Sequence, residues 1–171
     1  MLAHAHGVVL EVGAGTGLNF AFYTPEKVTR VEAVEPDSAM LKYARDRLAQ
    51  ARVPLTLTQA PAEALPFAND TFDCVVATLV FCSVDDPARG FQEIRRVLKP
   101  GGMLLLLEHV RSQNRFTACL QDLLVPLTTR LIGNCHWNRD TGQAVGAVGF
   151  QVRESRQVSG WLLPMILLQA T

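Results

Sequence analysis

The order of strand-like and helix-like segments constrains the fold of this chain more than any other feature. Short apolar runs rich in leucine or β-branched residues recur as "VVLEV", "VTRVEAVE", "LTLTQ", "DCVVATLV" and "MLLLLEHV". Between them, residues 38–51 and 87–99 have the apolar spacing of amphipathic helices, and "KPGG" is expected to end the second. The apolar face predicted for the first helix consists of Met40, Leu41, Ala44 and Leu48. This alternation predicts an α/β fold in which helices cover both faces of a parallel sheet.

The pattern changes after residue 110. A longer helical stretch around residues 118–132 precedes a polar loop, "GNCHWNRDTG", and the last two segments, "FQVRESRQV" and "WLLPMILLQAT", are predicted to form a hairpin. The chain has 171 residues, of which 49% are hydrophobic and 19% charged, and this composition suits one globular domain. We therefore expect a single domain over residues 1–171.

Charge and cysteine usage narrow the choice of partners and compartment. Sixteen basic and sixteen acidic residues balance, with no block of like charge, so a nucleic-acid partner is not expected. The cysteines show no CxxC spacing, "MLAHAHG" does not look like a secretory signal, and the longest apolar runs are too short to span a bilayer, so we expect a cytoplasmic protein. No metal site is expected, because the Cys135–His136 pair has no second ligand pair at a workable spacing.

A glycine-rich turn, Gly13-Ala14-Gly15-Thr16-Gly17, directly follows the first predicted strand. Open parallel sheets bind ligands at this position, although a tight strand-to-helix turn is the simpler alternative. Glu35 ends the second strand about 20 residues further on, where a carboxylate can accept both ribose hydroxyls or can merely be a solvated charge. Leu18 stands where a dinucleotide site would have its third glycine, and Glu11 would repel a pyrophosphate but suits an ammonium group. These residues favour S-adenosylmethionine over a nicotinamide dinucleotide.

Five motifs resemble, in order and spacing, those of class I S-adenosylmethionine-dependent methyltransferases: "LEVGAGTG", "VEAVEPD", "AEALPF", "FDCVVATLVFCSV" and "EIRRVLKPGGMLLLLEH". The similarity runs from about residue 8 to about residue 110. It implies a Rossmann-like, seven-stranded, mostly parallel sheet with an antiparallel last strand, and in-line methyl transfer. "GLNFAFY", "TLVFCSVDDP" and "GNCHWNRDTG" are further similar to the small thiol-methylating proteins, and more loosely to the ubiquinone and menaquinone C-methyltransferases.

The resemblance also implies roles for individual residues. The glycines would lie under the methionine part of the cofactor, Glu11 near its amino group, and Glu35 at the ribose, while Ala62 and Glu63 would flank the adenine. The cofactor-binding residues implied are Glu11, Gly13, Ala14, Gly15, Gly17, Glu35, Pro36, Ala62, Glu63 and Thr78. Many relatives carry an acid before the Ala-Glu pair, whereas this chain has Pro61. Relatives also place one or two cover helices before the first strand, so we expect that cover to be shortened or absent here and a homodimer to compensate.

The acceptor side offers fewer signals. His109 ends the fifth strand, where it is a candidate base or orienting group, or else a hydrogen-bonded histidine of the wall. Cys82 is expected to be a packed structural cysteine. The leading hypothesis is methyl transfer to a small, apolar acceptor such as a thiol or a quinol-type molecule. Two alternatives remain: a module that binds S-adenosylmethionine without turnover, and a nicotinamide-dependent oxidoreductase. Contact of the helix near residue 125 with a membrane surface is disfavoured, because this helix lacks a lysine-rich face.

Overall fold

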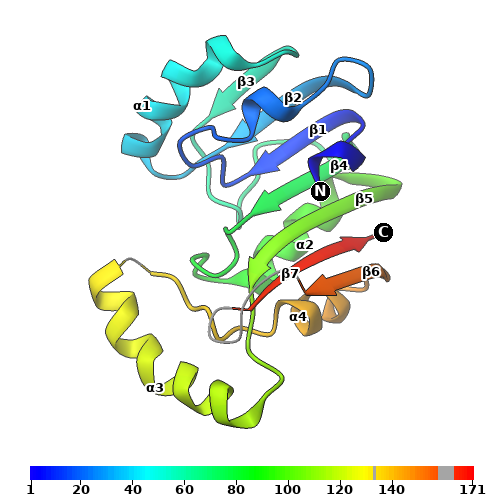
Figure 1. Cartoon of the computed structure of the whole chain (residues 1–171). Coiled ribbons are helices and arrows are strands. Elements are labelled where there is room, and N and C mark those ends of the chain that lie inside the picture. The colour runs from blue at the N-terminus through cyan, green and yellow to red at the C-terminus, as the bar shows by residue number, and fades with distance from the viewer. Residues whose placement is uncertain (133, 158–163) are drawn as a thin grey trace.

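The computed structural model describes residues 1–132, 134–157 and 164–171, and these residues form one seven-stranded sheet (Figure 1). The strand order is β3-β2-β1-β4-β5-β7-β6. β1 to β5 pair in parallel, while β7 runs antiparallel to both of its neighbours, β5 and β6. The predicted mostly parallel sheet with an antiparallel end is confirmed. The strands are β1 (Gly7–Val12), β2 (Val28–Val34), β3 (Leu55–Thr58), β4 (Phe72–Thr78), β5 (Leu98–His109), β6 (Val152–Gln157) and β7 (Met165–Ala170).

Four α-helices connect the strands in the described residues, namely α1 (Ser38–Arg47), α2 (Pro87–Val97), α3 (Arg115–Ile132) and α4 (Thr141–Ala147). Short 3-10 helices lie at η1 (Leu2–His4), η2 (Phe20–Phe22) and η3 (Leu48–Gln50). The carboxylate of Asp37 accepts from the backbone N–H groups of Ala39 and Met40, so Asp37 caps α1. Asp86 caps α2, because its carboxylate accepts from the backbone N–H of Arg89.

The alternation of side chains along each strand divides the core into two layers. On one face, Leu10, Val75 and Leu104 pack with Phe91 and Ile94 of α2, and this layer also includes Val145 of α4. On the other face, strand residues such as Val9 and Val76 pack with residues of η2 and α1. Both faces of the sheet are therefore covered, as predicted.

The structure corrects three details of the sequence prediction. Met40 lies at the edge of the α1 face, 42% exposed, whereas Leu41 and Ala44 are buried. The second helix ends at Val97 rather than at Lys99, and "KPGG" belongs to β5, which begins at Leu98. The helix α4 was not predicted, since Gly142 and Gly146 obscure its short pattern.

α3 stands apart from the sheet, beyond the C-terminal tip of β5 (Figure 1). Its exposed apolar side chains include Phe116, Leu123 and Leu127, and Pro126 lies inside it. Within the described part of the chain, no helix combines the length and hydrophobicity required to cross a membrane.

Candidate functional site

A pocket of about 700 Å³ opens at the carboxyl ends of the parallel strands. Its wall is built by the glycine turn after β1, the end of β2, residues 61–63 and the segment after β4. Ligand sites in open parallel sheets are found at this edge. Of the predicted cofactor-binding residues, eight line the pocket: Gly13, Ala14, Gly15, Glu35, Pro36, Ala62, Glu63 and Thr78. Glu11 and Gly17 do not belong to the lining.

The glycine turn has a left-handed backbone, and its glycines serve different purposes. A Cβ added to Gly13, at φ 67°, would approach a methyl carbon of Val80 to 2.5 Å, so this glycine allows close packing within the protein. A Cβ added to Gly15, at φ 56°, would meet no protein atom within 4 Å. Gly15 also lines the pocket, and a residue without a side chain there lets a ligand approach the backbone closely.

Glu35 holds the glycine turn against the end of β2. One carboxylate oxygen accepts from the N–H of Gly15 at 2.8 Å, and the other accepts from the N–H of Asp37 at 3.0 Å. Glu35 is 8% exposed and lines the pocket. A carboxylate offers about four acceptor positions, so two remain for hydroxyl groups of a ligand.

Glu11 lies on the sheet face covered by η2, where it is 2% exposed. The hydroxyl of Tyr23 and the amide of Asn19 each donate to one of its oxygens, both at 2.9 Å. Burial raises the pKa of Glu11 to about 7, although these two hydrogen bonds act in the opposite direction. The Asn19 amide also donates to Thr78 Oγ1 at 3.2 Å, and Asn19 lines the pocket. Asn19 therefore connects the buried carboxyl to the pocket wall.

Sequence reasoning missed Asn19 and Tyr23. The sequence singles out Glu11 as an acidic residue in an apolar strand. Nothing in "GLNFAFY" indicates that the side chains of Asn19 and Tyr23 both donate hydrogen bonds to Glu11. Met40, which was assigned to the helix core, also lines the pocket.

The pocket lining also includes Pro61, Ala62 and Glu63. Glu63 accepts from the N–H groups of Asp85 and Asp86 with the same oxygen, at 3.1 and 3.2 Å. Its carboxylate thus fixes the turn that precedes α2, and its second oxygen is not used in these two bonds.

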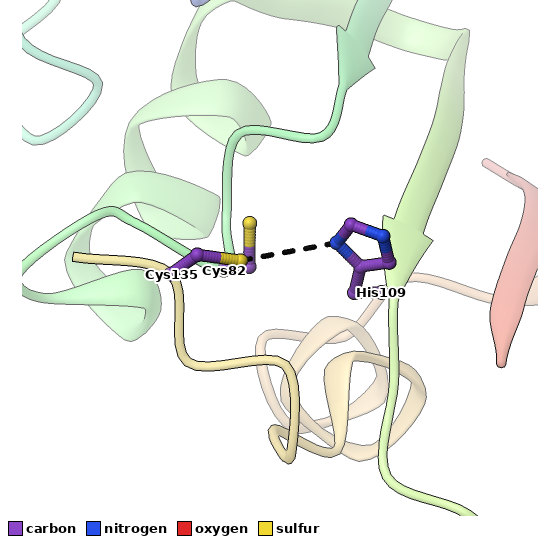
Figure 2. A group of neighbouring side chains, drawn as sticks. All are labelled: Cys82, His109 and Cys135. Atoms are coloured by element: carbon purple, nitrogen blue, oxygen red, sulfur yellow. Dashed lines mark hydrogen bonds between the residues drawn. The ribbon is translucent and has the colours of Figure 1, made fainter. Parts of the chain in front are cut away.

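His109, the candidate base or orienting group, does not line this pocket. It ends β5, half-buried, and its Nδ1 lies 3.8 Å from the Sγ of Cys135. Cys82 approaches the same point from the segment after β4 (Figure 2). The three potential metal-ligand atoms of Cys82, His109 and Cys135 lie within 4.8 Å of one another. Cys82 is buried, as predicted, but it lies beside His109 and Cys135, two neighbours that the sequence around Cys82 does not indicate.

The two thiols of this cluster have unlike acidities. Hydrogen bonding between them lowers the pKa of Cys135 to about 7 and, together with burial, raises the pKa of Cys82 to about 12. Hydrogen bonding to Cys82 also raises the pKa of His109. Cys135 is therefore the thiol of this pair that ionises first.

Glu108 adds a buried carboxyl beside the cluster. One oxygen accepts from the N–H groups of Val80 and Phe81, at 2.8 and 2.9 Å. The other oxygen has no hydrogen-bond partner among the residues described, and burial raises the pKa of Glu108 to about 7. The side chain thus ties β5 to the segment that carries Cys82.

Comparison with known proteins places this architecture in a family. A family model described as "Methyltransferase domain" matches residues 10–106, which is more than half of the chain. The chain belongs to this methyltransferase family. The resemblance to class I S-adenosylmethionine-dependent methyltransferases that the motifs predict is thereby confirmed, and S-adenosylmethionine is the cofactor of the family.

Relatives of this methyltransferase chain include two kinds of enzyme. It is 35% identical over 146 residues to thiol S-methyltransferase TMT1B of Rattus norvegicus, covering 83% of this chain and 59% of the relative. It is 34% identical over 139 residues to the ubiquinone/menaquinone biosynthesis C-methyltransferase UbiE of a Marinomonas species, covering 76% and 55%. The chain thus spans less than two thirds of the length of these relatives.

Solved structures agree on the fold. An S-adenosylmethionine-dependent methyltransferase from Mesorhizobium loti aligns with a TM-score of 0.73 at 18% identity, covering 95% of this chain and 89% of that one. At this identity the likeness concerns the fold alone.

Proposed function

We propose that this chain is a single methyltransferase domain that binds S-adenosylmethionine in the pocket and transfers the methyl group to a small, apolar acceptor. The observation that carries the proposal is the pairing of Gly15 with Glu35. The first leaves space where any other residue would place a side chain, and the second presents a buried carboxylate with free acceptor positions beside that space. This arrangement fits a ligand with vicinal hydroxyls.

The fit extends to the other walls of the pocket. Glu35 would accept from the ribose hydroxyls, Ala62 and Pro36 would contact the adenine, and the backbone of the glycine turn would lie along the methionine part. Because Glu11 is buried and does not line the pocket, whereas Asn19 donates to Glu11 and does line it, we infer that Glu11 acts on the ligand's amino group through Asn19 rather than by contact.

When bound, S-adenosylmethionine supplies a methyl group already activated by its sulfonium. The residues of this chain then have to orient the acceptor and exclude water, which are the main contributions to an in-line displacement. Ser83, Val84 and Asn134 also line the pocket and form the proposed acceptor side. Named relatives that methylate thiols and quinone precursors support a thiol or a quinol-type acceptor.

The first experiment separates cofactor classes. Calorimetry should detect binding of S-adenosylmethionine and no binding of NAD. Release of S-adenosylhomocysteine in the presence of alkyl thiols or quinol precursors then separates an enzyme from a module without turnover. Binding without release over the whole acceptor panel would contradict the proposed transfer.

Gly15 provides a specific check on the pocket. Gly15→Val should abolish S-adenosylmethionine binding, because the side chain would enter the ligand space. Gly101→Val is a matched control: Gly101 also has a positive φ, 77°, with no atom within 4 Å of an added Cβ, but it lies outside the pocket. Both variants carry the same kind of backbone strain, so a loss of binding in both would mean that strain rather than occupancy is responsible.

A further inference from the structure

Three side chains with metal-binding atoms converge beyond the tip of β5. Cys82 follows β4, His109 ends β5, and Cys135 lies in the segment between α3 and α4 (Figure 2). Their ligand atoms are within 4.8 Å of one another, and the Cys135 Sγ to His109 Nδ1 distance is 3.8 Å. Zinc bonds of about 2.3 Å to sulfur and about 2.0–2.1 Å to nitrogen, at tetrahedral angles, separate the ligand atoms by roughly 3.5–3.8 Å. The cluster thus needs only small side-chain adjustments to surround a cation.

We propose that Cys82, Cys135 and His109 form a three-ligand site for a zinc-class divalent cation. Two sulfur ligands and one imidazole are a donor set that zinc accepts, and three protein ligands leave a fourth position for water or another ligand. This proposal goes beyond the proposed function, because the site forms from protein residues that do not belong to the pocket lining and does not require bound S-adenosylmethionine.

The backbone holds these ligands in place before any cation arrives. The N–H of His136 donates to the carbonyl of Cys82 at 2.7 Å, which joins the two cysteine-bearing segments directly. The guanidinium of Arg139 donates to the carbonyls of Phe81 and Val84, both at 2.6 Å. His109 is fixed by the β5–β7 ladder, where it pairs with Met165. Ligands held by such a scaffold lose little entropy on metal binding.

The charge around the cluster also suits a bound cation. Cys82 is 2% exposed, so a thiolate there needs a compensating positive charge. Glu108, fully buried, lies next to His109 in the chain, and one of its oxygens has no hydrogen-bond partner among the residues described. Binding of the cation displaces the two thiol protons, which pass to the buffer, and the cysteines bind as thiolates.

Cobalt(II) is a suitable probe, because thiolate ligands give it intense near-ultraviolet charge-transfer absorption and a tetrahedral site gives it visible bands. The reduced full chain, without S-adenosylmethionine, should bind one equivalent of cobalt(II) with both signatures, and zinc(II) should displace it. His109→Ala should lower the affinity by at least about 100-fold, which is the upper end of losses seen for residues that only support a ligand.

Matched cysteine variants identify the ligands. Cys82→Ala and Cys135→Ser should each lose most of the charge-transfer absorption, while Cys74→Ala, which changes a buried cysteine of β4, and Cys119→Ser, which changes an exposed one, should retain it. Circular dichroism and melting of each variant verify folding, and Cys135→Ser keeps the test valid if Cys82→Ala does not fold.

Three results would overturn the proposal. One is the absence of thiolate-to-cobalt absorption in fully reduced, folded protein. The second is absorption that survives the loss of both Cys82 and Cys135. The third is a Cys82–Cys135 disulfide in the isolated protein whose reduction confers no metal binding, because the pair would then be a redox pair instead. Since none of these readouts involves methyl transfer, failure of the metal site and failure of the proposed function are distinguishable.

Discussion

Glu35 combines two roles in one side chain. It anchors the glycine turn through the N–H of Gly15, and it presents its remaining acceptor positions to the pocket. We predict that Glu35→Ala weakens S-adenosylmethionine binding by about 1–3 kcal/mol, because a charged acceptor is lost. Calorimetry on the folded variant measures this loss.

Glu32→Ala is the control for that measurement. Glu32 belongs to the same strand, β2, but does not line the pocket, so its removal should leave the affinity unchanged. Glu35→Gln keeps one oxygen acceptor and should fall between the wild type and the alanine variant. Equal affinities for the wild type and Glu35→Ala would remove Glu35 from the site.

At the scale of elements, residues 134–140, which precede α4, are held by hydrogen bonds rather than by a helix or strand. Arg139 donates to two carbonyls of the segment after β4, and its own N–H donates to the carbonyl of His136. We predict that Arg139→Met lowers the free energy of unfolding by about 1.5–3 kcal/mol, because hydrogen bonds from a charged donor are lost and two carbonyls remain unpaired. Urea denaturation measures the loss.

The control is Arg111→Met, which breaks an exposed ion pair with Asp122. Exposed pairs contribute little to stability, so the loss should be clearly smaller than for Arg139→Met. Arg139→Met should also weaken cobalt(II) binding without removing a ligand, because Arg139 only positions the segment that carries Cys135. Equal stability of the two variants would contradict this assignment.

Elements differ in how far their sequence reveals them. β1, β4 and β5 are buried on both faces, so continuous apolar runs such as "VVLEV" identify them. α4 has two glycines in seven residues, which weakens its helical sequence pattern. Its position depends on the Asp140 cap and on burial of Val145. The cluster of Cys82, His109 and Cys135 likewise has no local signature, because its members come from three separate segments that only the tertiary fold brings together. The positions of the glycine turn and of Glu35 were predictable, because each directly follows a strand that its own apolar sequence identifies.

At the scale of the whole molecule, buried carboxyls make stability depend on pH. Burial raises the pKa of Glu11 to about 7 from 4.5 in the unfolded chain, so the folded state holds a proton that the unfolded state has already released. We therefore predict that the contribution of Glu11 to stability falls as the pH rises from about 4.5 to about 7 and is constant above that range. This pKa difference corresponds to about 3 kcal/mol.

Glu11→Gln should remove that contribution. The difference in unfolding free energy between the variant and the wild type should grow in favour of the variant by about 3 kcal/mol between pH 4.5 and pH 8, as measured by urea denaturation. Glu108, whose pKa is raised in the same direction, is present in both proteins, so the comparison isolates Glu11. Parallel pH profiles for the two proteins would show that Glu11 ionises freely in the folded state.

The antiparallel end of the sheet has a consequence for local unfolding. Although β6 precedes β7 in the chain, β7 lies between β5 and β6, and within the described ladders β6 pairs with β7 alone. When β7 separates from β5, β6 loses its connection to the sheet as well, so the two strands open as one cooperative unit. The same event frees His109 from Met165. Hydrogen exchange of the amides that pair β7 with β5 therefore reports on the surroundings of His109, whereas β1, which precedes the glycine turn, keeps its pairing with β2 and β4.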